Sequence, residues 1–409
     1  MAKEYKDLVV GLDIGTSKVM VVVAEVMPGG ELKLAGLGIA ASNGLKRGVV
    51  VNIDATVQSI QQALKEAELM ADCKIARVYT GITGSHIRGI NSSGMVAVKD
   101  KEVTQADVAR VIETAKAINI STDQRLLLVE PQEFVIDGQD VREPIGMSGI
   151  RLEAKVHIVT GAQSAAENII KCVRRCGLEV DQLMLNPLAS SLAVLTQDEQ
   201  ELGVALVDIG AGTTDVAIFT GGAIRHTAVI PIAGDLITSD IAMALRTPTK
   251  DAEDIKVESG YAKQLLADPD TQVEVPGLGD RAPRLLSKQA LAGVIEPRIE
   301  EIYQLVQQVI RESGYEEVLS SGIVITGGSA VMPGMVELGE DIFLKPVRRG
   351  IPRYSSSLYD MVAQARAATV MGLLEEARLA RIRGYKVSQK AGSVHNAFGR
   401  VKDWFVGNF

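Results

Sequence analysis

The sequence predicts an α/β protein made of two duplicated lobes around a cleft, with a smaller α+β unit inserted in the first lobe. The main observation is a strand–turn–strand pattern that occurs twice, at residues 8–26 and 202–222. The aspartates at the two turns, Asp13 and Asp208, are separated by about half of the chain, so the repeat has the size of a domain. The length of 409 residues also exceeds what one ordinary core organises.

The bulk composition predicts a folded chain in a reducing compartment. Hydrophobic residues make up 46% and charged residues 23%, which is usual for soluble domains. Three cysteines are too few for a disulfide framework, and the N-terminus lacks the apolar core of a signal peptide. Because no long apolar run occurs, the sequence predicts a cytoplasmic protein that does not span a membrane.

Charge is distributed unevenly along the chain. The net charge is −8, but residues 378–409 contain seven Lys/Arg and one acidic residue, which leaves −14 on residues 1–377. An acidic body argues against a nucleic-acid partner. A basic end on such a body indicates a local partner that carries negative charge.

The two turns have the residues of a phosphate clamp. Three glycines allow positive φ and would let backbone N–H groups approach an anion closely: Gly15, Gly210 and Gly212. Hydroxyl and ammonium donors stand beside them: Thr16, Ser17, Lys18, Thr213 and Thr214. Asp13 and Asp208 each end a strand, where a carboxylate can hold Mg²⁺ through water. A plain β-turn would explain one such hairpin, but two between apolar strands favour a nucleotide site.

A third glycine-rich turn lies within residues 320–335. An apolar strand is followed by Gly327, Gly328 and Ser329, and then by an expected helix start. Two consecutive glycines would let the backbone pass flat against a planar ligand. An ordinary strand-to-helix turn has the same pattern, so this segment alone leaves both interpretations open.

Residues 85–160 predict a compact α+β unit that follows the first hairpin. The expected elements are strands at 94–98, 125–137 and 151–161 and a helix at 104–118. The helix is supported by apolar residues at helical spacing and by Thr104 as its N-cap.

A second inserted stretch is expected at about 232–308. It contains a Pro/Gly-rich loop and a long helical pattern at residues 287–314. Because Pro297 lies inside that pattern, we expect a kink or a break near Glu296.

The C-terminal segment is predicted to be a flexible basic linker, residues 384–392, followed by an amphipathic helix, residues 393–409. At about 100° per residue, one arc of this helix collects apolar side chains: Val394, Ala397, Phe398, Val401, Trp404, Phe405 and Phe409. Arg400 and Lys402 border that arc, where their charges can reach lipid headgroups. The pattern predicts an interfacial helix on an anionic phospholipid membrane, although such a helix can also dock on its own protein.

The order of hairpin, second hairpin and Gly-Gly turn resembles the actin-like ATPase superfamily, which includes the heat-shock chaperone ATPases and the sugar kinases. The two linking helices of that superfamily resemble residues 186–195 and 366–377, which are rich in small residues. The resemblance covers nearly the whole chain. It implies an actin-like ATPase fold that binds ATP and Mg²⁺ in a nucleotide cleft between two lobes.

Within this superfamily the chain resembles the FtsA family of bacterial cell-division proteins. The resemblance rests on the segments "GLDIGTSKV", "LVDIGAGTTDVAIF", "IPIAGDLITSDIA" and "ITGGSAVMPGM", together with the terminal amphipathic helix. It implies these parts: lobe 1A (residues 1–84, 161–198 and 366–383), inserted subdomain 1C (85–160), and lobe 2A (199–365) with its subdomain 2B (about 232–308).

The same resemblance implies partners and several site residues. Glu253 and Lys256 would contact the adenosine, and Gly234 would belong to the nucleotide-binding residues. Arg298 and Glu301 would receive the C-terminal tail of FtsZ, the tubulin-like division protein, although a solvated helix face explains the same charges. The family further implies filaments of the protein with itself and recruitment of later division proteins through subdomain 1C. These properties would place the chain on the cytoplasmic face of the inner membrane at the division site, where it anchors the FtsZ ring.

One departure from the superfamily pattern concerns catalysis. The chaperone ATPases and many bacterial actins open the first linking helix with Glu-Pro, and that glutamate helps to orient the attacking water. The matching dipeptide here is Asn186-Pro187, and an amide cannot accept the proton of water as a carboxylate can. We therefore expect a slow ATPase at most, with Asn186 as a candidate for positioning the water.

Three other members of the superfamily are alternatives to this interpretation. A pilus-assembly actin homologue shares the actin-like body, but the terminal amphipathic helix argues against it. A sugar kinase needs a carboxylate base and a sugar pocket, and the sequence offers no clear motif for either. A chaperone needs a peptide-binding domain after the ATPase, and few residues follow the second linking helix.

Overall fold

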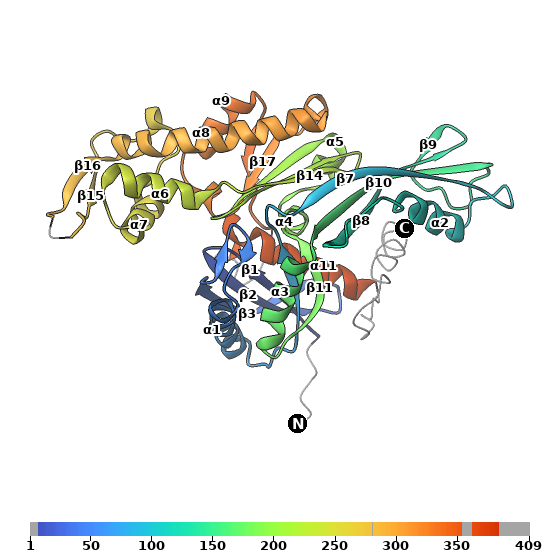
Figure 1. Cartoon of the computed structure of the whole chain (residues 1–409), viewed down its shortest axis with the longest axis horizontal. Helices are drawn as coiled ribbons and strands as arrows, with labels where there is room; N and C mark the ends of the chain where they lie inside the picture. Colours follow the sequence, from blue (N-terminus) through green and yellow to red (C-terminus); the bar gives the residue numbers. More distant parts are fainter. Residues whose placement is uncertain (1–6, 280, 354–361, 384–409) are drawn as a thin grey trace.

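The computed structural model describes residues 7–279, 281–353 and 362–383, which form two lobes and one inserted unit (Figure 1). In Figure 1 the first lobe lies at the bottom, the second lobe spans the top, and the inserted unit extends to the right. The predicted linker, 384–392, and the predicted amphipathic helix with its membrane-facing residues, 393–409, lie outside the described residues. Among the helices that the structure describes, none is long and apolar enough to cross a membrane.

The first lobe is built on a five-stranded sheet in the order β11-β6-β1-β2-β3. Its strands are β1 (Leu8–Ile14), β2 (Lys18–Val26), β3 (Leu32–Ala41), β6 (Arg77–Ile82) and β11 (Glu179–Leu185). Odd-numbered residues from Val19 to Val23 pack in one core with α1 (Ile53–Ala71) and α3 (Gln163–Arg175), and even-numbered ones pack on the opposite face. Because β2 is buried on both faces, its sequence is an almost continuous apolar run.

The second lobe repeats this plan with the sheet order β14-β13-β12-β17-β18. Its strands are β12 (Val204–Ile209), β13 (Thr214–Thr220), β14 (Ala223–Ile230), β17 (Ile323–Thr326) and β18 (Val347–Arg349). In both lobes the hairpin is antiparallel, a third antiparallel strand follows it, and the first strand runs parallel to a later one. The predicted duplication of two α/β lobes is therefore confirmed.

The remaining elements of the second lobe are mostly helical. They are α5 (Gln197–Leu202), α6 (Gly234–Leu245), α7 (Thr249–Ser259), α8 (Lys288–Ser313), α9 (Met335–Phe343) and the ribbon of β15 (Gln272–Val275) with β16 (Arg284–Ser287). Short 3₁₀ turns occur at Gln264–Leu266, Glu316–Val318, Ser329–Val331 and Ala365–Ala367.

Of the kink or break predicted near Glu296, the break is excluded, because α8 runs as one helix through Pro297. Proline removes one backbone hydrogen bond, and that loss would favour a break in an isolated helix. Here Ile295 before the proline and Ile299 after it are both fully buried in the same core. Burial of one continuous apolar face on both sides of Pro297 outweighs the missing bond.

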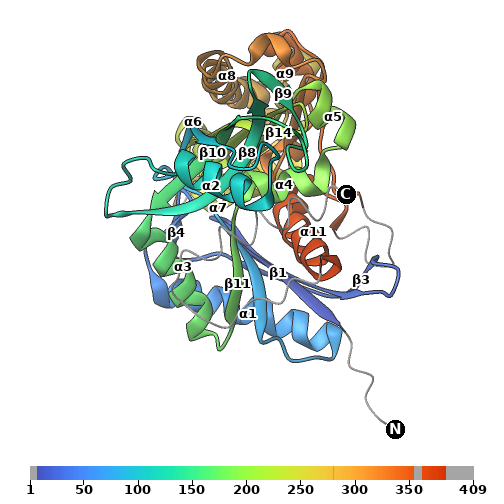
Figure 2. The ribbon, with the colours of Figure 1, turned by 90° about the vertical axis from the view of Figure 1, so that its right-hand side faces the viewer.

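The inserted unit is a four-stranded antiparallel sheet covered by one helix, in the order β7-β10-β8-β9. Its elements are β7 (Arg88–Ala97), α2 (Gln105–Ala115), β8 (Gln124–Ile136), β9 (Gln139–Val141) and β10 (Arg151–Ala162). Thr104 caps α2 as predicted, and Asp107 completes a capping box. The first strand begins at Arg88, earlier than the predicted residue 94, and the α+β architecture is confirmed. Figure 2 shows the unit in front of the second lobe and above the first.

Two linking helices cross between the lobes, α4 (Asn186–Val194) and α11 (Ala368–Ile382). They touch closely, since a Cβ on Gly372 would overlap the carbonyl group of Ala189. The small residues predicted for a tight helix crossing therefore lie at the contact. A short ribbon of β4 (Leu45–Lys46) and β5 (Val49–Val50) follows β3 and leads toward the second lobe.

Candidate functional site

The turns of the two hairpins lie against each other, and we call this region the interlobe site. A Cβ on Gly212 of the second turn would lie 2.6 Å from Oγ1 of Thr16 in the first turn. The backbone N–H of Gly48 donates to the same Thr16 oxygen at 3.1 Å. The two sequence-predicted turns therefore meet, with residues 47–48 beside them, whereas Ser17 is exposed at the end of its turn.

The turn glycines do not use the positive φ that glycine allows, because Gly15, Gly210 and Gly212 all have ordinary negative or extended φ angles. The hairpins close instead through backbone hydrogen bonds from Gly15 N–H to Lys18 O at 3.0 Å and from Gly210 N–H to Thr213 O at 2.9 Å. Glycine is needed for space, since a side chain at Gly212 would run into the opposite turn.

Asp13 and Lys18 form the charged part of the first hairpin. Burial raises the pKa of Asp13 to about 6, against the attraction of Lys18, and the charge of Asp208 raises it further. Burial also lowers the pKa of Lys18 to about 8, while Asp13 acts in the opposite direction. The Lys18 ammonium donates to the carbonyl oxygen of Arg366, which lies just before the second linking helix.

Asp208 of the second hairpin is held by both linking helices. Ser190 Oγ of α4 donates to Asp208 Oδ2 at 2.6 Å, and Thr369 Oγ1 of α11 donates to the same oxygen at 3.3 Å. Burial raises the pKa of Asp208, and these two hydrogen bonds oppose that effect. Sequence reasoning missed both hydroxyls, although the serines in "NPLASSLAV" were a signal for that of Ser190.

Asp215 on β13 is a third buried carboxylate that sequence reasoning missed. Thr83, just after β6 of the first lobe, donates to one of its oxygens, and Thr213 Oγ1 donates to the other at 3.2 Å. Burial, and then the charge of Asp208, raise the pKa of Asp215 to about 7. The signal was an aspartate inside an otherwise apolar strand.

Asn186 lies at the first position of α4, against the first lobe. Its Oδ1 is buried and makes no hydrogen bond within the described part of the chain. A Cβ on Gly81 in β6 would overlap that oxygen. The amide therefore faces the β6 wall of the interlobe site, where an unpaired acceptor is free for a water proton.

The residues implied for adenosine come together beside the second hairpin. Lys256 Nζ donates to Glu253 Oε2 at 2.6 Å, to Thr238 Oγ1 at 2.8 Å and to Gly234 O at 3.2 Å. The backbone N–H of Gly234 in turn donates to Gly210 O at 3.2 Å. This side of the site is thus a connected network of α6, α7 and the second turn.

The Gly-Gly turn adjoins the same network. Ser329 Oγ donates to Gly210 O at 2.9 Å, so the third turn touches the second hairpin. Gly327 has a φ of +92°, and a Cβ there would overlap Oδ1 of Asp208. A 3₁₀ turn at Ser329–Val331 follows in place of the expected direct start of a helix, which begins at Met335.

Three carboxylates and one ammonium define the electrostatics of the site. Asp13, Asp208 and Asp215 repel one another, and Lys18 is the cation that acts on Asp13 and Asp208. Carboxylate oxygens are hard ligands that suit Mg²⁺, and a divalent cation would relieve the repulsion. The residues present therefore fit a magnesium ion, which Asp13 and Asp208 would hold.

Arg298 and Glu301 lie on α8, away from the hairpin turns. Arg298 forms a two-pronged ion pair with Asp240 of α6, through Nε at 2.6 Å and Nη2 at 3.0 Å. It also contacts Glu301 one helical turn away. The pair ties α6 to α8 and leaves Glu301 half exposed.

Comparisons with known proteins place the chain in a family. A family model described as "Cell division protein FtsA" matches residues 205–372, and one described as "SHS2 domain inserted in FTSA" matches residues 84–160. The cell division protein FtsA of Pseudomonas aeruginosa is 54% identical over 409 residues, covering 98% of each chain. The chain belongs to the FtsA family. The Escherichia coli K12 member is 44% identical and covers 99% of each chain, so the relationship extends over the whole sequence of this actin-like cell-division family.

Solved structures support the fold. The "PilM-PilN type IV pilus biogenesis complex" contains a chain with a TM-score of 0.63 at 17% identity, covering 92% of this chain and 98% of that one. MreB5 of Spiroplasma citri bound to ADP has a TM-score of 0.55 at 15% identity, covering 93% and 97%. At these identities the likeness concerns the fold, and it confirms the actin-like architecture expected from the sequence.

Proposed function

We propose that this FtsA-family protein binds ATP with Mg²⁺ in the interlobe site, polymerises, and anchors the FtsZ ring to the cytoplasmic face of the inner membrane. The observation that supports the proposal most is the meeting of two duplicated hairpin turns around buried carboxylates and one lysine. Later division proteins would be recruited through the inserted unit, residues 85–160. Residues 393–409 would supply the membrane contact.

In the proposed complex the two hairpins would bind the phosphates and Mg²⁺, and the adenosine network would bind the nucleoside. Backbone N–H groups and hydroxyls of the turns would hold the phosphates, and Lys18 would neutralise part of their charge. The residues concerned are Gly15, Thr16, Ser17, Gly210, Gly212, Thr213 and Thr214. Mg²⁺, held through Asp13 and Asp208, would supply charge neutralisation at the phosphates. Gly234, Glu253, Lys256 and the turn at 327–329 would form the adenosine end.

Hydrolysis is proposed to be slow. Asn186 can orient a water through its unpaired Oδ1 but cannot remove the proton. Asp215 is a carboxylate with a pKa near neutrality, yet Thr83 and Thr213 already occupy its oxygens. Nucleotide binding would therefore serve mainly to set the conformation and the assembly of the protein.

The partner contacts belong to two surfaces. The C-terminal tail of FtsZ would bind on α8 near Glu301, with Arg298 positioning it from the α6–α8 ion pair. The membrane contact would use the apolar arc and its flanking cations: Val394, Phe398, Arg400, Val401, Lys402, Trp404, Phe405 and Phe409. Burial of several apolar side chains at about 1 kcal/mol each, reduced by the ordering of the helix, makes one tail a weak anchor. Many tails on one filament bind far more strongly because their effective concentration is high.

Co-sedimentation with liposomes that contain anionic phospholipid tests this function. With ATP and Mg²⁺ the full chain is expected to pellet with the liposomes. For a chain ending at Gly392 and for the Trp404→Glu variant, the pelleted amount should be lower by about tenfold or more. Electron microscopy of the pelleted sample should show membrane-bound filaments. Equal pelleting of the truncated and full chains would refute the membrane role, and full pelleting without filaments would refute the coupling to assembly.

A further inference from the structure

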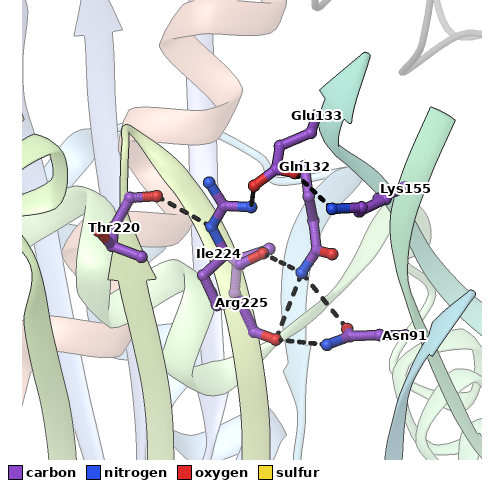
Figure 3. A network of polar contacts seen from close by, with 7 residues as sticks. All are labelled: Asn91, Gln132, Glu133, Lys155, Thr220, Ile224 and Arg225. Atoms are coloured by element: carbon purple, nitrogen blue, oxygen red, sulfur yellow. Dashed lines mark hydrogen bonds and ion pairs between the residues drawn. The ribbon is translucent and has the colours of Figure 1, made fainter. Parts of the chain in front are cut away.

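The inserted unit is fastened to the edge strand of the second lobe. Gln132 Nε2 on β8 donates to the carbonyl oxygens of Ile224 at 2.8 Å and Arg225 at 3.3 Å on β14 (Figure 3). Asn91 Nδ2 on β7 donates to the same Arg225 oxygen at 3.1 Å. Side-chain amides of one unit thus satisfy backbone acceptors that an edge strand would otherwise present to water.

A charged pair strengthens the same contact. Arg225 Nη1 forms an ion pair with Glu133 Oε1 at 2.6 Å, and its Nε donates to Thr220 O at 3.1 Å (Figure 3). Lys155 holds the other Glu133 oxygen at 2.9 Å. The Arg225 side chain is only 11% exposed, so separation of the pair would leave a poorly solvated charge. We call Asn91, Gln132, Glu133 and Arg225 the latch.

The contact continues from the latch toward the interlobe site. His157 Nδ1–H donates to Asn91 Oδ1 at 2.6 Å, and Thr227 Oγ1 of β14 lies 2.9 Å from His157 Nε2. Burial lowers the pKa of His157 to about 4, so the ring is neutral at physiological pH. Gly89 lies flush with β14, because a Cβ there would be 2.6 Å from Thr227 Oγ1.

At the interlobe site, this row of contacts ends with the hydrogen bond between Thr83 and Asp215. Asp215 is paired with Val229 of β14, and Ile218 with His226, so one hairpin of the second lobe reaches from the site to the latch. On the other side, residues 83–91 run from the end of β6 into β7. The second lobe therefore touches the end of β6 and the inserted unit along one continuous row of contacts. A rotation between the two lobes must break these contacts or move the inserted unit.

The attachment of the inserted unit to the first lobe has features of a hinge. An open groove of about 240 Å³ lies there, and its lining includes His86, Arg88, Ile90, Gln124 and Thr160. Two polar atoms beside it, His86 Nε2 and Gln124 Oε1, are buried and have no hydrogen-bond partner in the described part of the chain. The β8–β10 pairing also shifts register between Val159 and Thr160. The bulge and the two unpaired polar atoms mark the place where the sheet of the inserted unit can bend relative to the first lobe.

We propose that the latch makes the position of the inserted unit depend on nucleotide: closure of the lobes around ATP holds the latch together, and loss of ATP lets the unit swing at the hinge. The inference rests on the proposed binding of ATP in the interlobe site. It links that site to the surface through which the inserted unit would meet other proteins. Such coupling is reciprocal. If bound ATP increases the closing equilibrium constant of the latch by some factor, then closing the latch increases the affinity for ATP by the same factor.

A substitution that opens the contact tests the reciprocal effect. In the Gly89→Ala variant the added Cβ would lie 2.6 Å from Thr227 Oγ1 and 2.9 Å from Thr227 O, so β7 must move away from β14. Affinity for a fluorescent ATP analogue is then measured on the full chain. Gly89→Ala is expected to bind at least about fivefold more weakly than the natural chain. Gly29→Ala, where an added Cβ meets no atom within 4 Å, is the control, and an unchanged affinity of Gly89→Ala overturns the inference.

Amide hydrogen exchange provides a second test of the proposed coupling between ATP and the latch. ATP with Mg²⁺ is expected to slow exchange in residues 223–230 and 88–91 several-fold in the natural chain. The Glu133→Gln/Arg225→Gln variant should lose this slowing and bind ATP roughly five- to tenfold more weakly. The control is Asp54→Asn/Arg175→Gln, which removes an exposed ion pair within the first lobe and should behave as the natural chain.

The two proposals fail differently in this experiment. If ATP protects the hairpins at 8–26 and 202–222 but leaves residues 223–230 unchanged, the latch inference is overturned and nucleotide binding stands. If ATP protects neither hairpin, the proposed nucleotide site is wrong, and the inference that depends on it falls as well.

Discussion

The two hairpins of the interlobe site have the same backbone and opposite chemistry. In the first, Asp13 is paired across the strands with Met20, and Lys18 follows the turn. In the second, Asp208 is paired directly with another carboxylate, Asp215. Like charges placed opposite each other destabilise a hairpin, so the second lobe keeps a strained arrangement that the first lobe lacks. The two copies have the same hairpin backbone. The first copy contributes the lysine of the site, and the second contributes two of its three carboxylates.

The largest expected effect comes from removing the cation that distinguishes the first hairpin. Lys18→Ala should weaken ATP binding roughly 10- to 100-fold, because a charge-assisted contact to phosphate is lost and Asp13 loses its counter-charge. Isothermal titration calorimetry measures the change. Lys33→Ala, an exposed lysine on β3 of the same sheet, is the control and should bind as the natural chain does. A change below twofold for Lys18→Ala would contradict the assigned role.

The second prediction removes the carboxylate that distinguishes the second hairpin. The raised pKa of Asp215, about 7, means that the folded state holds a proton that the unfolded state releases near 3.8. Its contribution to stability is therefore fully present below about pH 4 and is lost as pH rises through 7. Asp215→Asn should remove this loss and raise the free energy of unfolding at pH 8 by about 1–3 kcal/mol.

Urea unfolding of the nucleotide-free chain between pH 5 and pH 8 checks the Asp215 prediction. The natural chain should lose stability across this range, and Asp215→Asn should show a shallower slope. Asn can still accept the hydrogen bond of Thr83, so the contact between the lobes is retained. Parallel slopes for the two proteins would show that Asp215 is ionised throughout.

The smallest expected effect concerns how the helices support the second hairpin. Ser190→Ala removes the donor 2.6 Å from Asp208 and should weaken ATP binding about three- to fivefold, since the carboxylate loses its main partner. Ser191→Ala is a matched control, because that hydroxyl donates to Leu188 O within the same helix. Fluorescence titration compares the two. Equal effects at both positions would mean that Asp208 does not depend on α4.

The sequence was most informative where structure depends on local periodicity and least informative where distant segments meet. Apolar runs and the repeated turn predicted both hairpins, and Thr104 predicted the start of α2. The reason for the turn glycines and the continuity of α8 were not predicted, because close approach to the other turn and burial around Pro297 decide them. These are properties of packing, which spacing along one segment does not reveal.

The missed site residues have the same cause. The partners Thr83 and Asp215 are 132 positions apart, and Thr369 and Asp208 are 161 positions apart. The latch joins Glu133 to Arg225 across 92 positions. A buried aspartate in an apolar strand can be noticed in the sequence, but its partner is known only when the fold brings the two lobes together.

The packing of α11 against β1 sets the timing of folding during synthesis. A Cβ on Gly11 would lie 2.8 Å from Val370 O, so the first strand of the chain is completed by one of its last described helices. At roughly 5–20 residues per second, a ribosome needs on the order of tens of seconds to make the segment between them. During that interval the inserted unit can fold, while the apolar face of the first sheet that α11 covers stays exposed. A nascent chain that stalls in this window would therefore depend on chaperones more than the finished protein does.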